Sequence, residues 1–241
     1  MYIIGITGPS GAGKTTALRV LEALGGRVFD CDAVYHALLR TDGELLGRIE
    51  AAFPGAVKDY ALDRKALGAR VFADPAGLET LTAITQPIVA KRVLEEINRT
   101  SKIAVGAHSV RPDCPEQTAQ NAGAHCAPLQ QDGSVSSSPI AYCPLPVASF
   151  AVIDAIGLFE SGLGEQCDLT VAVVADPETR VRRLMARDGV SEDYARARIA
   201  AQKPAEFYTA QAALVLENNG AEAEFAQKCR AVFQTILRQR M

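Results

Sequence analysis

The segment from Gly8 to Thr15 constrains the fold of this chain more than any other part of its sequence. Its residues, GPSGAGKT, fit the pattern G-x-x-x-x-G-K-[ST]. The preceding run from Tyr2 to Thr7 is apolar and β-branched, which is typical of a buried strand, and residues 14–24 place apolar side chains at helical spacing. Between a strand and a helix, this pattern binds the phosphates of a nucleoside triphosphate. The sequence therefore predicts a phosphate-binding loop, or P-loop.

Each residue type in the P-loop suits a defined part of a polyphosphate. Glycines let successive backbone N–H groups turn inward, Lys14 is expected to reach the β- and γ-phosphates, and the Thr15 hydroxyl is suited to ligate Mg²⁺. We therefore expect ATP and Mg²⁺ as cofactors. The residues expected to contact the nucleotide are Gly8, Gly11, Ala12, Gly13, Lys14, Thr15 and Thr16. The loop does not identify the acceptor, because ATPases, GTPases and kinases share it.

Strand-like and helix-like segments alternate along much of the remaining chain. Further apolar runs predict strands over residues 27–30, 147–154, 169–175 and 214–216, and helical spacing predicts helices over 33–39, 177–187, 191–202 and 221–238. Such alternation indicates a parallel sheet covered by helices on both faces. A chain of 241 residues can form one sizeable core. We therefore expect a single three-layer α/β domain over residues 1–241.

Two segments depart from this alternation. Helical periodicity dominates residues 42–97, with breaks expected at Pro54-Gly55, Asp74-Pro75 and Pro87, which predicts a helical substrate-binding subdomain. Residues 101–146 are rich in Pro, Ser, Gly, Ala, Gln and Cys and show no sustained period. We expect this second segment to be a flexible insertion.

Composition limits the classes of partner. The net charge is −3, with 48% hydrophobic and 22% charged residues, so the chain resembles a soluble globular protein and carries no overall basic excess for nucleic acid. No apolar run reaches the roughly 18 residues that a membrane-spanning helix needs, and no signal peptide is evident. We expect a cytoplasmic protein, a monomer or weak homo-oligomer, without nucleic-acid or membrane partners.

Three aspartates stand where predicted strands end. Asp30 and Asp32 follow the second strand, and a carboxylate there can accept the proton of an attacking hydroxyl group; Asp32 is the better candidate for the base. Either residue could instead cap a helix or lie in a solvated turn, and Asp32 is an acceptable N-cap for the helix over 33–39. Asp154 ends a later strand, where it could approach Mg²⁺ through water.

A cluster of arginines lies on two predicted helices. Its members are Arg180, Arg182, Arg183, Arg187, Arg196 and Arg198. Positive charge there would suit a lid, over residues 180–203, that closes on the phosphates of ATP. For any single arginine, a solvated helix face with acidic partners is an equally good interpretation.

With these features in order, the chain resembles the dephospho-coenzyme A kinases, a family of P-loop kinases. The similar segments are ITGPSGAGKTT at 6–16, FDCDAVYHAL at 29–38, LDRKALGARVFADP at 62–75, IDAIGLFESGL at 153–163 and LENNG at 216–220. Arg183, Arg187, Ser191 and Gln202 stand where the lid pattern R-x-x-x-R…S…Q of the family would place them. Only the P-loop is specific by itself, and the order and spacing of the segments make the resemblance strong.

The resemblance implies a fold, a reaction and roles for several residues. It implies a three-layer P-loop kinase that transfers the γ-phosphate of ATP to the ribose 3′-hydroxyl of dephospho-coenzyme A, the last step of coenzyme A biosynthesis. Asp32 would be the base, and Lys14, Arg183 and Arg187 would stabilise the transferring phosphoryl group. Asn218 would lie near the adenine, and the helical segment over 42–97 would receive the acceptor.

Several positions depart from the family pattern, and two alternatives stay open. The departures are Gln86, Ile156, Gly157, Tyr208 and Ala213. They leave Lys14 and Asp32 in place. One alternative is a kinase for a nucleoside monophosphate or another small molecule, and the other is a module that binds ATP without catalysis.

Overall fold

The computed structural model of this protein describes residues 1–58, 61–107 and 150–240. Its centre is a five-stranded sheet whose neighbouring strands all run parallel. In spatial order the strands are β2 (Gly26–Asp30), β5 (Phe150–Asp154), β1 (Tyr2–Thr7), β6 (Leu169–Val174) and β7 (Leu214–Glu217). The expected parallel sheet is confirmed, and residues 147–149 of the strand predicted over 147–154 lie outside the described part.

Both faces of the sheet are apolar. Successive side chains of a strand point to opposite sides, so an uninterrupted apolar strand contributes to both faces. In β5, Phe150 and Val152 pack into the cluster that includes α1 (Lys14–Ala23) and α9 (Glu222–Arg240), whereas Ala151 and Ile153 pack into the cluster on the other face. All four side chains are fully buried. Burial on both faces explains why the strands appear in the sequence as continuous apolar runs.

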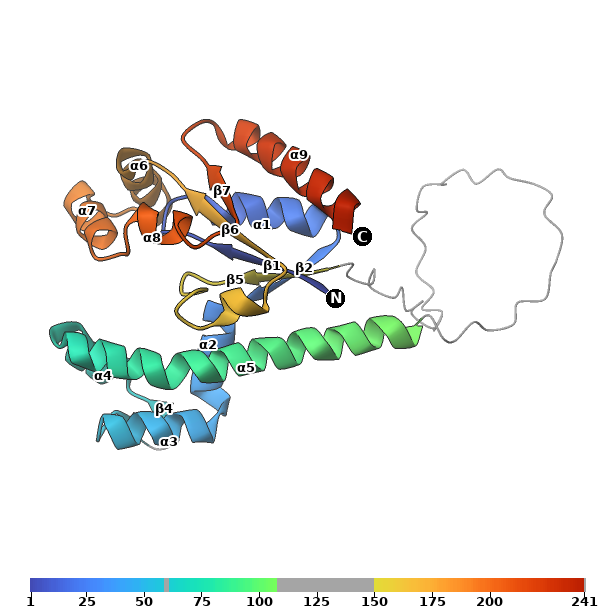
Figure 1. The fold of residues 1–241 in the computed structure, drawn as a ribbon. Helices are drawn as coiled ribbons and strands as arrows, with labels where there is room; N and C mark the ends of the chain where they lie inside the picture. Colours follow the sequence, from blue (N-terminus) through green and yellow to red (C-terminus); the bar gives the residue numbers. More distant parts are fainter. Residues whose placement is uncertain (59–60, 108–149, 241) are drawn as a thin grey trace, which may run out of the picture.

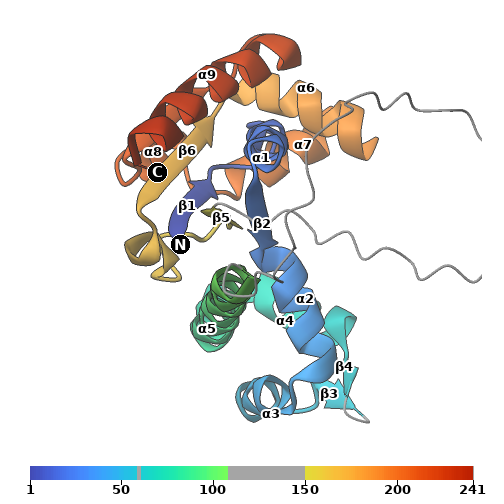
Figure 2. The same cartoon turned by 90° about the vertical axis from the view of Figure 1, so that its right-hand side faces the viewer.

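Helices form one layer on each side of the sheet (Figure 1; Figure 2). With α1 and α9 lie α6 (Pro177–Asp188), α7 (Glu192–Ala200) and α8 (Ala205–Thr209); the opposite layer contains α2 (Cys31–Thr41), α3 (Gly43–Ala52), α4 (Arg64–Ala73) and α5 (Pro75–Ala107). A short 3₁₀ helix, η1 (Leu163–Gln166), lies between β5 and β6. This is the three-layer α/β arrangement that the sequence predicts.

The expected break of helix α5 at Pro87 is wrong. The helix runs for 33 residues from Pro75 to Ala107 and contains this proline. Val89, Val93 and Ile97 are buried in the core cluster of that layer. Packing along the helix therefore keeps it continuous, although proline removes one backbone hydrogen bond.

A small hairpin within residues 42–97 is absent from the sequence prediction. Strands β3 (Val57–Lys58) and β4 (Ala61–Leu62) pair antiparallel after the expected break at 54–55. The carboxylate of Glu50 accepts the backbone N–H groups of Gly55 at 2.6 Å and Val57 at 2.7 Å, which fixes the turn that leads into the hairpin. Strands of two residues are too short to show an alternating pattern.

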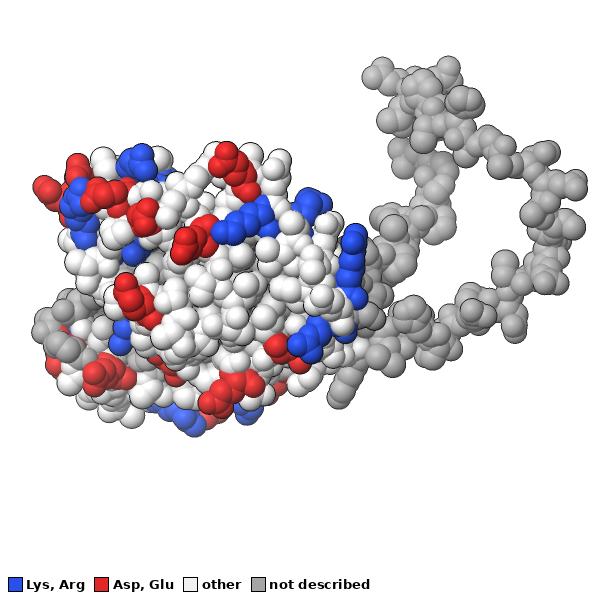
Figure 3. Space-filling view, turned by 45° about the horizontal axis from the view of Figure 1, so that its top comes forward, with Lys and Arg blue, Asp and Glu red and all other residues white. Residues whose placement is uncertain are grey.

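Residues 101–107 of the segment expected to be irregular belong to helix α5, so the expectation is wrong for these residues. Residues 108–146 of the expected insertion lie outside the described residues. Over the parts of the chain that the structure describes, no helix is both long enough and apolar enough to cross a membrane. Figure 3 shows acidic and basic side chains interspersed over the face in view, so charges on this face offset one another locally.

Candidate active site

The P-loop connects the end of β1 to the start of α1. Lys14 is the first residue of α1, and its ammonium group donates to the carbonyl oxygens of Gly8 at 2.7 Å and Pro9 at 3.4 Å. The lysine side chain therefore folds back along the loop. Burial lowers the pKa of Lys14, while the negative charges of Asp154 and Asp32 act to raise it. The loop thus holds a cation that faces two carboxylates.

Gly13 lets the loop pack directly against Asn218. Its φ of 100° lies in the left-handed region, and a Cβ atom there would approach Asn218 Nδ2 to 2.1 Å. The Asn218 side chain donates to the carbonyl oxygen of Ala12 at 2.8 Å, and its Oδ1 accepts from Arg183 at 3.1 Å. Asn218 is 4% exposed, so its amide is committed to contacts that shape the P-loop.

A pocket of about 390 Å³ opens in front of the loop. Its lining consists of Ser10, Gly11, Gly13, Lys14, Thr15, Asp32, Asp154, Ile156, Arg183, Arg187 and Arg198. Strands β1, β2 and β5 end at the same edge of the sheet, where Asp154 pairs in register with Ile6 and Asp30. The parallel topology therefore brings together side chains that are far apart in the sequence.

The structure separates the roles of Asp30 and Asp32. The carboxylate of Asp30 accepts the backbone N–H groups of Asp32 at 2.8 Å and Ala33 at 3.0 Å, so Asp30 caps helix α2. The expectation that Asp32 could cap a helix starting at residue 33 is wrong, because the helix already begins at Cys31. Asp32 lies in the first turn, exposed, and lines the pocket.

Thr15 and Asp154 supply oxygen atoms to the same pocket. Thr15 is exposed at the start of α1, and Asp154 ends β5. A hydroxyl and a carboxylate beside a phosphate site are ligands that suit Mg²⁺, either directly or through water. The residues present therefore fit the expected metal. Among the described residues, no cluster of three or more His, Cys, Asp or Glu side chains forms a metal site of its own.

Burial changes the protonation of Asp154. It raises the pKa of this carboxyl from 3.8 to about 6; the charge of Lys14 lowers that pKa, and the charges of Asp30 and Asp32 raise it. The folded protein therefore holds this proton more tightly than the unfolded chain does. Stability is consequently lost as pH rises through the interval between the two pKa values.

This shift predicts a pH-dependent effect of Asp154→Asn in protein free of nucleotide and divalent metal. As pH rises from about 4 to about 7, the free energy of unfolding of the variant relative to that of wild type should increase by roughly 2–3 kcal/mol, because asparagine never ionises. Urea unfolding at a series of pH values measures the difference. Asp176→Asn is the matched control, since Asp176 is an exposed helix N-cap whose side chain forms no capping hydrogen bond. If the stability of both variants relative to wild type changed equally with pH, the raised pKa would not belong to Asp154.

The predicted arginine cluster divides into members that line the pocket and members that do not. Arg187 and Arg198 line it, and both pair with Asp188, at 2.7 Å and 2.8 Å. Arg183 also lines it, but its guanidinium donates to the carbonyl oxygens of Asn218 at 2.9 Å and Gly220 at 3.2 Å. Arg183 therefore ties the P-loop side of the pocket to the segment after β7.

The remaining arginines have other partners. Arg196 pairs with Glu178 and Glu192, both at 2.7 Å, on the exposed face of the lid helices. Arg182 donates to the Thr179 hydroxyl at 3.1 Å. Arg180 is buried and lies outside the pocket lining. The interpretation of a solvated face with acidic partners therefore describes Arg196, and it also fits Arg187 and Arg198, which are exposed and pair with Asp188 although they line the pocket. It does not describe Arg180 or Arg183.

Other predicted nucleotide contacts shape the loop without lining the pocket, namely Gly8, Ala12, Thr16 and Asn218. The Thr16 hydroxyl donates to Glu222 at 3.3 Å, on the side of α9. The sequence assigned no individual role to Ser10 or Ile156 and placed Arg198 only within the arginine cluster, and all three line the pocket. The position of Arg198 in the lid cluster was the one available signal for it.

The positions that depart from the family pattern have different surroundings. A Cβ atom on Gly157 would lie 3.0 Å from Gln86 Nε2, so the glutamine occupies the space beside that glycine. Tyr208 is 1% exposed and belongs to the interior. Ala213 is exposed and precedes β7, at the edge of the sheet opposite the P-loop. The departures at 208 and 213 therefore do not line the pocket.

Comparison with known proteins identifies the family. The dephospho-CoA kinase family model matches residues 2–110 and 142–224. A dephospho-CoA kinase of Anaeromyxobacter dehalogenans is 35% identical over 230 residues, which cover 95% of this chain and 89% of that protein. TT1252 of Thermus thermophilus superimposes with a TM-score of 0.64 at 31% identity, covering 98% of this chain and 97% of that one. The dephospho-CoA kinase of Campylobacter jejuni shares the fold, with a TM-score of 0.57 at 21% identity over 99% and 98% of the two chains. The chain therefore belongs to the dephospho-CoA kinase family.

Proposed function

We propose that this protein transfers the γ-phosphoryl group of ATP to the ribose 3′-hydroxyl of dephospho-CoA, giving CoA and ADP. The observation that carries the proposal is the convergence of Lys14, Asp32 and Arg187 on one pocket at the mouth of the P-loop. A kinase needs a cation for the phosphoryl group and a base for the hydroxyl group within one site. The family membership identifies the acceptor.

The charges that line the pocket suit a polyphosphate. The cations Lys14, Arg183, Arg187 and Arg198 outnumber the anions Asp32 and Asp154. In our proposal Lys14 and Arg187 stabilise the charge of the phosphoryl group during transfer, and the loop N–H groups orient the polyphosphate. Mg²⁺, held by Thr15 and through water by Asp154, would neutralise part of the phosphate charge.

Asp32 is the proposed base. It is exposed in the pocket and follows β2, while the neighbouring Asp30 is occupied by capping α2. A carboxylate at this position can accept the proton of the 3′-hydroxyl as the oxygen attacks phosphorus. Helix α2, which carries Asp32, belongs to the helical layer with α3, α4 and α5. We infer that the acceptor enters between this layer and the P-loop.

An acceptor-dependent assay tests the function. With ATP and Mg²⁺, we expect ADP to form rapidly with dephospho-CoA and only at background rate without it, and we expect the product to carry a 3′-phosphate by ³¹P NMR. CoA is the matched control acceptor, because its 3′-hydroxyl is already phosphorylated. Adenosine monophosphate and shikimate test the alternative of another small-molecule kinase.

The outcomes separate the alternatives. Turnover of a different acceptor in place of dephospho-CoA would overturn the proposed acceptor and retain a kinase. ATP binding without turnover of any acceptor would identify a non-catalytic nucleotide-binding module.

A further inference from the structure

Arg180 is a buried cation behind the P-loop. It lies on α6 and is 4% exposed, and within the described residues no carboxylate forms an ion pair with it. A buried guanidinium group is costly unless its N–H groups find acceptors and its charge is used or balanced. Because no carboxylate balances this charge among the described residues, the groups around Arg180 should show how the charge is used.

The acceptors of Arg180 come from the P-loop and from the end of the lid. Arg180 Nε donates to the carbonyl oxygen of Ser10 at 2.9 Å, and its Nη2 donates to Oε1 of Gln202 at 2.8 Å. The same Gln202 oxygen accepts the backbone N–H of Ser10 at 3.0 Å, and Gln202 Nε2 donates to the Ser10 hydroxyl at 2.7 Å. Every polar group of Ser10 is therefore held by these two side chains, and we name the three residues the Ser10 brace.

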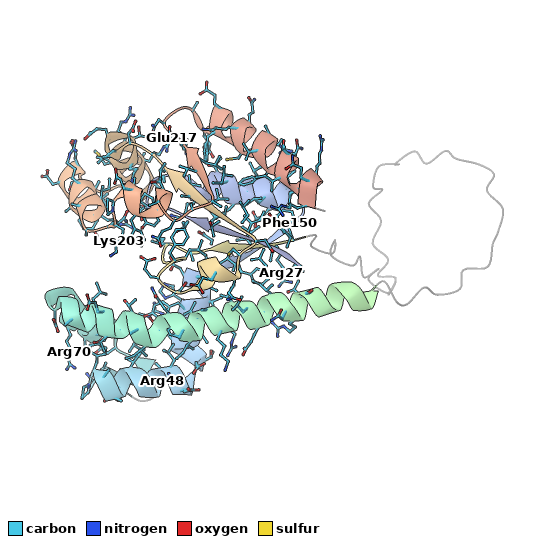
Figure 4. The ribbon with its side chains drawn as sticks, in the orientation of Figure 1. Arg27, Arg48, Arg70, Phe150, Lys203 and Glu217 are labelled. Carbon is cyan, nitrogen blue, oxygen red and sulfur yellow. The ribbon has the colours of Figure 1, made fainter. Side chains whose placement is uncertain are left out.

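The brace separates two cavities. The pocket in front of the P-loop includes Ser10, whereas Arg180 and Gln202 line a second pocket of about 470 Å³ behind it. Figure 4 labels two further residues of that second pocket, Lys203 and Glu217. None of the residues that the structure describes lines both pockets. Arg180 and Gln202 therefore act on a nucleotide in front of the loop only through Ser10 and through their charge.

The contact between α6 and the loop is close. A Cβ atom on Gly11 would lie 3.0 Å from the carbonyl oxygen of Arg180, so the helix backbone packs directly against the loop. A cationic donor on the Ser10 carbonyl polarises the peptide group that joins Ser10 to Gly11 and strengthens its N–H as a donor. The positive charge of Arg180 also reaches the site, since it contributes to the lowered pKa of Lys14.

We propose that Arg180 and Gln202 are positioning residues for the polyphosphate: they hold Ser10 so that the loop keeps its binding shape, and Arg180 adds positive charge behind it. The proposal rests on the proposed use of ATP and does not depend on the acceptor. Gln202 follows lid helix α7, and Arg180 lies on α6 before that helix. The brace therefore also connects both ends of the lid to the P-loop.

The substitution Gln202→Glu tests the contribution of the Arg180 charge while it keeps the size of the side chain. Glutamate keeps an oxygen acceptor for Ser10 and Arg180, but its negative charge neutralises the arginine. We expect ATP affinity to fall by about tenfold, and ADP affinity to fall less, because ATP carries more negative charge. Isothermal titration calorimetry with ATP and with ADP measures this, and the thermal unfolding midpoint should equal or exceed that of wild type. Gln211→Glu is the matched control, since Gln211 is exposed and lies before β7 at the opposite edge of the sheet.

The proposal is overturned if Gln202→Glu binds ATP with wild-type affinity, or if its affinities for ATP and for ADP fall by the same factor. If that variant does not fold, two substitutions of Arg180 replace it. Arg180→Lys keeps the charge and should retain the preference for ATP over ADP, whereas Arg180→Met should reduce it; equal preferences in the two variants would refute the electrostatic role. Since these titrations contain no acceptor, failure to phosphorylate dephospho-CoA would leave their result unaffected.

Discussion

Replacing Lys14 by methionine should lower kcat with ATP and dephospho-CoA by about a thousandfold or more. Removal of one well-placed donor from a developing negative charge typically costs about a hundredfold to a thousandfold in rate, and Lys14 also supplies a full charge. Its ammonium group lies along the P-loop, 2.7 Å from the Gly8 carbonyl oxygen, within the pocket lining. Methionine keeps an unbranched side chain and removes the charge. Steady-state kinetics with a coupled ADP assay measure the loss.

Lys228→Met is the matched control for this prediction. Lys228 is exposed on α9, its ammonium group donates to the carbonyl oxygen of Glu217 at 3.4 Å, and it does not line the pocket. Its substitution should leave kcat within about twofold of wild type, since exposed substitutions rarely perturb a protein by more than about 0.5 kcal/mol. A Lys14→Met enzyme that retained a tenth of wild-type kcat would contradict the role given to Lys14.

Asp32→Asn should lower kcat by about a hundredfold to a thousandfold while ATP affinity stays near that of wild type. Asparagine has nearly the same shape but cannot accept the proton of the acceptor hydroxyl group, and general base catalysis typically contributes factors of this size. Asp32 is exposed in the pocket, two residues after the end of β2. Single-turnover kinetics, combined with calorimetry of ATP binding, separate the chemical step from nucleotide binding.

The neighbouring Asp30 supplies the control for Asp32. Asp30 caps α2 by accepting two backbone N–H groups, and asparagine caps helices about as well as aspartate does. Asp30→Asn should therefore keep most of kcat and most of the stability. Equal losses in the two variants would indicate that the negative charge of the segment matters, rather than a base at Asp32.

Local sequence was sufficient to predict the five strands of the central sheet and most helices of this fold. Residues 2–7 were predicted as a strand and form β1 (Tyr2–Thr7), and helix α6 ends at Asp188, one residue beyond the predicted end. These elements were predictable because apolar side chains recur at the period of the element that buries them, and because glycine marks the turn. The continuation of α5 through Pro87 was not predictable in this way, since packing against several helices outweighs the local preference of proline.

The arginine cluster illustrates what local sequence leaves undetermined. Arg180 and Arg183 are one helical turn apart, yet one lies behind the P-loop and the other lines the pocket in front of it. Their partners, Ser10 and Asn218, are 170 and 35 residues away in the chain. No pattern within α6 carries that information.

The sequence by itself determined that this chain has a P-loop between a strand and a helix, and that Lys14 and Thr15 belong to it, because the geometry of that loop depends on glycines at fixed spacing, here Gly8, Gly11 and Gly13. It also limited the candidates for the base to Asp30 and Asp32, with Asp32 preferred. Only the tertiary structure assigned the capping role to Asp30, left Asp32 in the pocket and placed Arg180 and Gln202 on Ser10. The physical reason is that the charge and hydrogen bonds of a side chain act over a few ångströms in space, whatever the separation along the chain.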